Sequence, residues 1–112
     1  MAESRLPGFD DREKSQERKF QQEQELAFRL RSRRNKLLGQ WAAGRMGLAG
    51  DAAEAYAAAL VVSAVERADD ATILATLGRD LAAKGVGLDE EAIRRELTRC
   101  AQTAKRELGA PE

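Results

Sequence analysis

One long stretch without glycine or proline constrains the fold of this chain more than any other feature. Neither residue type occurs in Phe9–Leu38, and a run of this length without a helix breaker predicts one continuous helix. Its two halves differ, because residues 10–25 contain a single apolar side chain, Phe20, whereas residues 26–41 are rich in leucine and aromatic residues. The polar half has almost nothing to bury in a core. We therefore expect it to project from a small helical bundle as an arm that binds a partner.

The composition favours an all-α fold. The 112 residues suffice for one domain, and their apolar share is mostly alanine and leucine, which suit helices better than strands. Segments that contain glycine divide the remainder into three further helices with short connections, an arrangement typical of antiparallel neighbours. We predict a small four-helix bundle with a polar, partly disordered N-terminal arm that continues into the first helix. The predicted boundaries are 1–20 for the arm and 21–112 for the bundle.

Helix ends and inward faces can be predicted from local signals. Asp10, Asp51 and Asp89 stand where N-caps are expected, and the third helix is expected to start at Asp69 or Asp70. Gly109 is expected to end the last helix, and Gly39 within a helical pattern indicates either close packing or a bend. The residues that follow the helical period and are expected to face the core are Leu26, Leu30, Leu37, Trp41, Ala53, Tyr56, Ala57, Leu60, Val61, Ala64, Val65, Ile73, Leu74, Leu77, Leu81, Ile93, Leu97, Cys100, Ala104 and Leu108. Ala27 and Leu38 lie beside this stripe on the first helix.

Two aromatic residues distinguish the polar arm from a simple solvated helix. At about 100° per residue, Phe9 and Phe20 lie within about 20° of each other on a helix. Two such anchors on one face are typical of a helix that binds in a groove. The alternative is that Phe20 packs onto the edge of the bundle. Because a lone polar helix is marginal in water, we expect the arm to become ordered when it binds.

The residue inventory argues against an enzyme. The chain has no histidine and a single cysteine, Cys100, which we expect to be a buried thiol on an apolar helix face. Phosphate-binding, nucleophile-elbow and metal-binding motifs are missing, so we predict no catalytic residue, no metal and no required cofactor. Basic and acidic residues balance at 19 each, and the longest apolar run, Ala57–Val62, is far too short for a membrane span. We expect a cytoplasmic protein that is monomeric when free.

A basic stretch, Arg29–Lys36, has three interpretations. It holds five cationic side chains and no acidic one. The first interpretation is ion pairing with acidic residues of the second and fourth helices, for which Asp51, Glu54, Glu90 and Glu91 are candidates. A contact with another protein comes second. The third is a helical bundle that senses nucleotides or associates with nucleic acid through this basic stretch.

Two segments resemble a known family. The sequence of Phe9–Lys14 (FDDREK) with Lys19–Phe20, and that of Arg33–Ala43 (RRNKLLGQWAA), are similar to the zeta-subunit family of alphaproteobacterial F-type ATP synthases, small inhibitors of ATP hydrolysis by the catalytic head. The resemblance covers about 9–108. The eight residues before Phe9 and the glutamines at 21, 22 and 24 depart from the family pattern.

The resemblance implies both a mechanism and a site. The arm would enter a catalytic interface between an alpha and a beta subunit, approach the gamma shaft, and block rotation in the hydrolysis direction only. Weak ATP or ADP binding is also associated with the family, although no phosphate-cradling motif supports it in this sequence. The partner-binding residues that the resemblance implies are Phe9, Asp10, Asp11, Arg12, Glu13, Lys14, Glu17, Lys19 and Phe20 in the arm, and Arg33, Arg34, Asn35 and Lys36 in a second segment.

Overall fold

The computed structural model describes residues 7–67 and 69–110, with side chains described from residue 14 onward. The predicted all-α class is confirmed, since the described residues form helices joined by short connections. The helices are α1 (Pro7–Arg45), α2 (Gly50–Arg67), α3 (Asp70–Ala83) and α4 (Glu90–Leu108).

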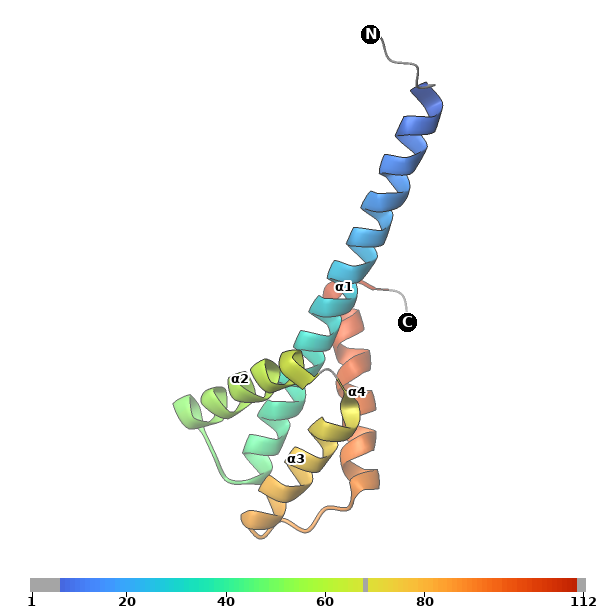
Figure 1. The fold of residues 1–112 in the computed structure, drawn as a ribbon. Coiled ribbons are helices and arrows are strands. Elements are labelled where there is room, and N and C mark those ends of the chain that lie inside the picture. Colours follow the sequence, from blue (N-terminus) through green and yellow to red (C-terminus); the bar gives the residue numbers. More distant parts are fainter. Residues whose placement is uncertain (1–6, 68, 111–112) are drawn as a thin grey trace.

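The bundle occupies one end of the molecule and α1 runs far beyond it (Figure 1). At about 1.5 Å per residue, the 39 residues of α1 span about 58 Å. The principal extents are 71 × 25 × 25 Å and the radius of gyration is 19.5 Å, against about 13 Å expected for a compact chain of this length. In the bundle α1 packs mainly against α2 and α4. The molecule is therefore a small helical body with a long helical extension.

The observed helix ends confirm part of the capping prediction. The side chain of Asp69 accepts a hydrogen bond from the Thr72 N–H, and that of Asp89 accepts one from the Ala92 N–H. Gly109, in the left-handed region at φ 69°, caps the C-terminus of α4. Asp10 and Asp51 were wrongly predicted as N-caps, because α1 already begins at Pro7 and α2 at Gly50. Proline suits a first helical position, where its missing N–H costs nothing.

The core forms where the four helices meet. The predicted inward residues of α3 are all buried, as are those of α4 up to Ala104. Two predicted core residues are wrong: Val65 and Leu108 are exposed. On α1 the buried face centres on Leu38, which was expected beside the stripe, whereas Leu37 and Trp41 of the expected stripe are only partly buried. Its fully buried apolar residues are Leu38, Ala42 and Ala43.

Gly39 lies at a close contact between α1 and α2, which confirms one of the two predictions made for it. A Cβ atom placed on Gly39 would lie 2.8 Å from the Cα and 3.1 Å from the Cβ of Ala57. Real Cβ atoms do not approach a backbone this closely, so only glycine allows α1 and α2 to approach to this separation. This contact helps to fix the direction in which α1 leaves the bundle.

Candidate functional site

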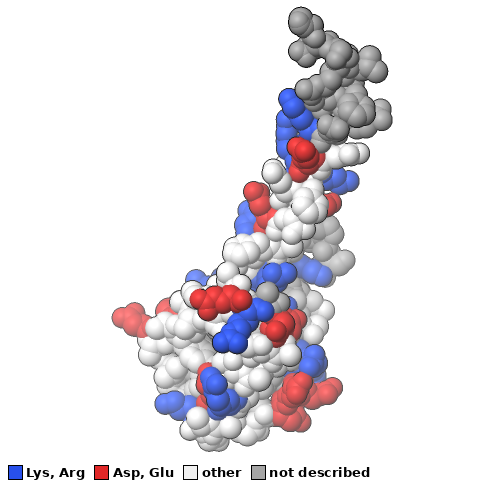
Figure 2. Space-filling view, in the orientation of Figure 1, with Lys and Arg blue, Asp and Glu red and all other residues white. Residues whose placement is uncertain are grey.

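The polar part of α1 presents a continuous exposed surface. From Lys14 through Glu25 every side chain is exposed, and Leu26 is the first that is half-buried. Phe20 is 62% exposed, so it does not pack onto the edge of the bundle, which was the alternative prediction for this ring. Basic and acidic side chains are intermixed along this projecting part (Figure 2). Such a helix can offer an aromatic anchor and charges of both signs to a groove.

Five of the predicted arm residues, Phe9 to Glu13, lie on the backbone of α1, but their side chains are outside the described residues. Lys14, Glu17 and Lys19 are exposed on the same projecting helix as Phe20. The structure thus places the predicted arm residues along one helix. Their role in binding a partner stays a prediction.

The second predicted segment is partly occupied by ion pairs within the chain. Arg33 donates from Nε to Glu107 Oε1 at 2.5 Å, and Arg34 donates from Nη2 to Asp70 Oδ1 at 2.9 Å. Ion pairing with the bundle was therefore predicted correctly, but with the wrong partners. Neither arginine binds one of the predicted carboxylates, which were Asp51, Glu54, Glu90 and Glu91. Glu90 instead pairs with Arg94 of its own helix, and Glu54 accepts a hydrogen bond from Gln40.

The Arg33–Glu107 pair also perturbs the titration of both groups. The hydrogen bond to the Glu107 carboxylate raises the pKa of Arg33, and the same hydrogen bond lowers the pKa of Glu107. The two shifts agree in sign with a charge-assisted bond between α1 and α4. Both side chains are substantially exposed, so solvent weakens the pair. The pair links α1 to α4 but is expected to add little to the free energy of unfolding.

The basic stretch also holds a buried asparagine and three exposed basic side chains. Asn35 is 1% exposed, and its Oδ1 accepts a hydrogen bond from Arg34 Nε at 3.0 Å. Arg29, Arg31 and Lys36 are exposed, and no carboxylate of the described residues pairs with them. These three cations are available to a partner, whereas Arg33 and Arg34 would first have to leave Glu107 and Asp70.

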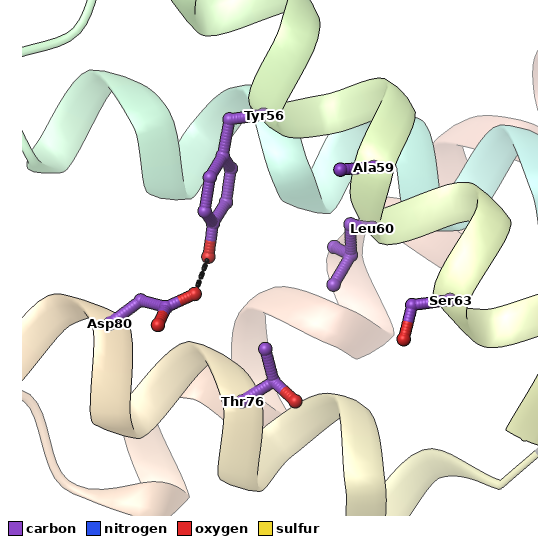
Figure 3. A pocket seen from close by; sticks show the side chains of 6 residues that line it. All are labelled: Tyr56, Ala59, Leu60, Ser63, Thr76 and Asp80. Atoms are coloured by element: carbon purple, nitrogen blue, oxygen red, sulfur yellow. Dashed lines mark hydrogen bonds between the residues drawn. The ribbon is translucent and has the colours of Figure 1, made fainter.

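A cavity lies between α2 and α3 (Figure 3). Its volume is about 180 Å³, and the Tyr56 hydroxyl donates across it to Asp80 Oδ2 at 2.7 Å. Desolvation raises the pKa of Tyr56, and the hydrogen bond to Asp80 adds to this effect. Ser63 and Thr76 also line the cavity. Sequence reasoning missed the Tyr56–Asp80 bond, because the sequence gives no signal for which carboxylate a half-buried tyrosine will meet.

The described residues show no grouping of histidine, cysteine and acidic side chains that could hold a metal ion. Cys100, predicted to be a buried thiol, is indeed buried in the core, and desolvation raises its pKa to about 11. A thiol with so high a pKa is a poor nucleophile at neutral pH. Within the same described part of the chain, no helix is long and apolar enough to cross a membrane.

Comparison with known families shows which family the chain belongs to. The family model described as ATPase inhibitor subunit zeta matches residues 7–107. The chain belongs to the zeta-subunit family. The match includes the projecting part of α1 from its first helical residue, the paired arginines and the α2–α3 cavity. No curated protein and no solved structure matches the chain.

Membership defines the class of function. An inhibitor subunit of an ATPase regulates another protein's catalysis, which agrees with the predicted non-enzymatic role. The expectation that no cofactor is required, and that ATP or ADP binds weakly, stays a prediction.

Proposed function

We propose that this protein inhibits ATP hydrolysis by the catalytic head of the F-type ATP synthase. The projecting part of α1 inserts into a catalytic interface between an alpha and a beta subunit and reaches toward the gamma shaft. There it obstructs rotation in the hydrolysis direction while synthesis proceeds. The partners are the alpha, beta and gamma subunits, with no nucleic acid and no insertion into the membrane. The protein acts in the cytoplasm, at the inner membrane, through the synthase.

The observation that carries this proposal is the unburied helix from Lys14 to Glu25, in a chain that belongs to an inhibitor family. A helix whose described side chains from Lys14 to Glu25 are all exposed adds nothing to the core of the bundle. Inserted between two subunits, it would bury Phe20 and pair its charges with the partner. A rigid element lodged between subunits that must move during turnover resists that movement.

The bundle supports the arm by reducing the cost of binding. Ordering a free segment typically costs about 2–5 kcal/mol of the gross interaction energy. In this chain the arm is continuous with the packed half of α1, so the helix needs no separate nucleation. A preorganised helix loses less conformational entropy when it binds.

The test is the rate of ATP hydrolysis by an alphaproteobacterial F-type ATPase head, titrated with the protein and its variants. A chain lacking Met1–Gln21 should lose inhibition while circular dichroism shows that the bundle remains folded. Phe20→Ala should raise the inhibitory concentration about tenfold if the ring is a buried anchor. The matched control is Gln22→Ala, a truncation of an exposed side chain on the same helix, which should change it little.

The outcomes separate the alternatives. Full inhibition by the truncated chain would move the inhibitory site to the bundle and refute the role of the arm. Equal inhibition by Phe20→Ala and Gln22→Ala would remove Phe20 as an anchor. No inhibition by the full chain would refute the proposed function itself.

A further inference from the structure

A small groove opens between α1 and α2 beside the place where α1 leaves the bundle. Its volume is about 110 Å³. The walls include Phe28 of α1 with Val61 and Val65 of α2, Arg31 stands at its edge, and Asn35 is the most buried residue lining it. Sequence reasoning missed this groove, because Val65 was expected to face the core.

The walls of the groove expose large apolar side chains to solvent. Phe28 is 51% exposed and Val65 is 55% exposed. An isolated exposed apolar residue needs no explanation, but apolar side chains from two helices around one depression are typical of an interaction site. For comparison, an engineered apolar cavity of about 150 Å³ binds one benzene molecule. At about 110 Å³, somewhat below that volume, the groove can hold one small apolar side chain of a partner.

The buried amide gives the groove a hydrogen-bond donor. The Oδ1 atom of Asn35 accepts from Arg34 Nε, whereas its Nδ2 atom donates to no described residue. Asn35 is 1% exposed and lines the groove, and no buried side-chain nitrogen or oxygen of the described residues lacks a hydrogen-bond partner. An amide that lines the groove can donate to an acceptor oxygen that an occupant brings.

The charge at the edge of the groove selects the kind of partner. Arg31 is exposed and has no carboxylate partner within the described part of the chain. Arg29 and Lys36 on the same helix are likewise without an acidic partner there. An apolar side chain flanked by a carboxylate would satisfy the walls, the amide donor and the positive edge together.

We propose that this groove is a second contact with the catalytic head, and that it receives one apolar side chain from an acidic surface segment of that head. This inference rests on the proposed function for the identity of the partner. Phe28 lies about 12 Å along α1 from Phe20, at about 1.5 Å per residue. Insertion of the arm therefore brings the groove against the surface next to the entry point. The arm supplies the obstruction, and the groove sets how deep and in which rotation the arm inserts.

A pair of valines on α2 allows a matched test. Val65 lines the groove and is 55% exposed, whereas Val62 does not line it and is 59% exposed. Val65→Glu places a carboxylate in the apolar groove and opposes an acidic partner. We expect the dissociation constant of the full-length protein for the purified ATPase head to rise about tenfold or more, equivalent to about 1.4 kcal/mol. Val62→Glu adds the same charge to the same helix and should change it by less than about threefold.

Folding and partner identity are checked separately. Because both valines are exposed, both variants should retain the circular dichroism spectrum and thermal midpoint of the parent. If Val65→Glu does not remain folded, Phe28→Ser provides a second groove variant. A photoreactive label on Val65→Cys should cross-link to a peptide of the head that carries Asp or Glu beside an apolar residue. The buried Cys100 leaves the new thiol as the selective site of labelling.

The outcomes distinguish this inference from the proposed function. If Phe20→Ala weakens binding while Val65→Glu and Val62→Glu bind equally, the groove proposal is overturned and the arm mechanism stands. If Val65→Glu weakens binding and loss of the arm does not, the groove is supported and the arm mechanism fails. Cross-linking to a basic segment, or equally from Val62→Cys, would overturn the groove's proposed occupant.

Discussion

Replacing Gly39 by alanine tests whether the close approach of α1 and α2 is required. In a helix interior the change from glycine to alanine should by itself stabilise by about 1 kcal/mol. Here the new methyl group would lie 2.8 Å from the Cα of Ala57, and a backbone atom cannot move aside as a flexible side chain can. Overpacking of this kind costs about 1–3 kcal/mol. We therefore expect the free energy of unfolding to fall by about 1 kcal/mol.

Gly78 is the matched control, because it also lies within a helix. A Cβ atom placed there would meet only Ile93 Cδ1, at 4.0 Å, which is an ordinary van der Waals contact. Gly78→Ala should thus keep the propensity gain and stabilise by about 1 kcal/mol. The free energy of unfolding should fall by about 1 kcal/mol in Gly39→Ala and rise by about 1 kcal/mol in Gly78→Ala, a difference of about 2 kcal/mol.

The measurement is urea unfolding of both variants, followed by far-ultraviolet circular dichroism, with thermal unfolding as a second readout. For a domain of this size, 1 kcal/mol shifts the thermal midpoint by roughly 4 °C. The midpoints should lie on opposite sides of the parent. If Gly39→Ala is as stabilising as Gly78→Ala, then α1 and α2 can separate without cost, and the argument that Gly39 fixes the direction of α1 is refuted.

Two further predictions concern single hydrogen bonds. Tyr56→Phe should lower the free energy of unfolding by about 1 kcal/mol, because a hydroxyl 2.7 Å from Asp80 Oδ2 is lost from a partly solvated pair. A double-mutant cycle with Asp80→Ala should show a coupling energy of about the same size. A coupling energy near zero would contradict this prediction. The hydrogen bond from the Thr72 N–H lowers the pKa of Asp69 below its ordinary value of 3.8, so its stabilising contribution is present above pH 3.8 and is lost as the pH falls through the lowered pKa. Asp69→Asn keeps an acceptor but cannot titrate, so urea midpoints measured across this acidic range should fall less steeply than in the parent; an unchanged slope would exclude Asp69 as a source of acid sensitivity.

The features that could be predicted from sequence are those set by neighbouring residues. The caps Asp69, Asp89 and Gly109 each depend on a backbone group within a few residues, so local sequence is sufficient. The inward faces of α3 and α4 follow one helical period because each helix buries one stripe. Gly39 could be recognised as unusual, although only the structure identifies Ala57 as the reason.

The features that could not be predicted depend on where helices meet. The salt-bridge partners of Arg33 and Arg34 are Glu107 and Asp70, far away in sequence, and a long arginine can choose among several carboxylates within reach. The face of α1 was only partly predicted, because its packing against both α2 and α4 also buries the polar Asn35. The groove beside Phe28 arises from this crossing and has no signature of its own in the sequence.

The exposed arm and the packed bundle depend on each other physically. An isolated polar helix from Lys14 to Glu25 would be marginal in water, since nucleation is costly and no apolar face offsets it. In this chain nucleation has already occurred in the packed half of α1, and each arm residue only adds one backbone hydrogen bond to an existing helix. The Gly39 contact and the packing of α1 against α2 and α4 fix the axis of that helix. The bundle therefore does more than carry the arm: it keeps the arm helical and sets its direction, so inhibition should depend on residues far from the arm itself.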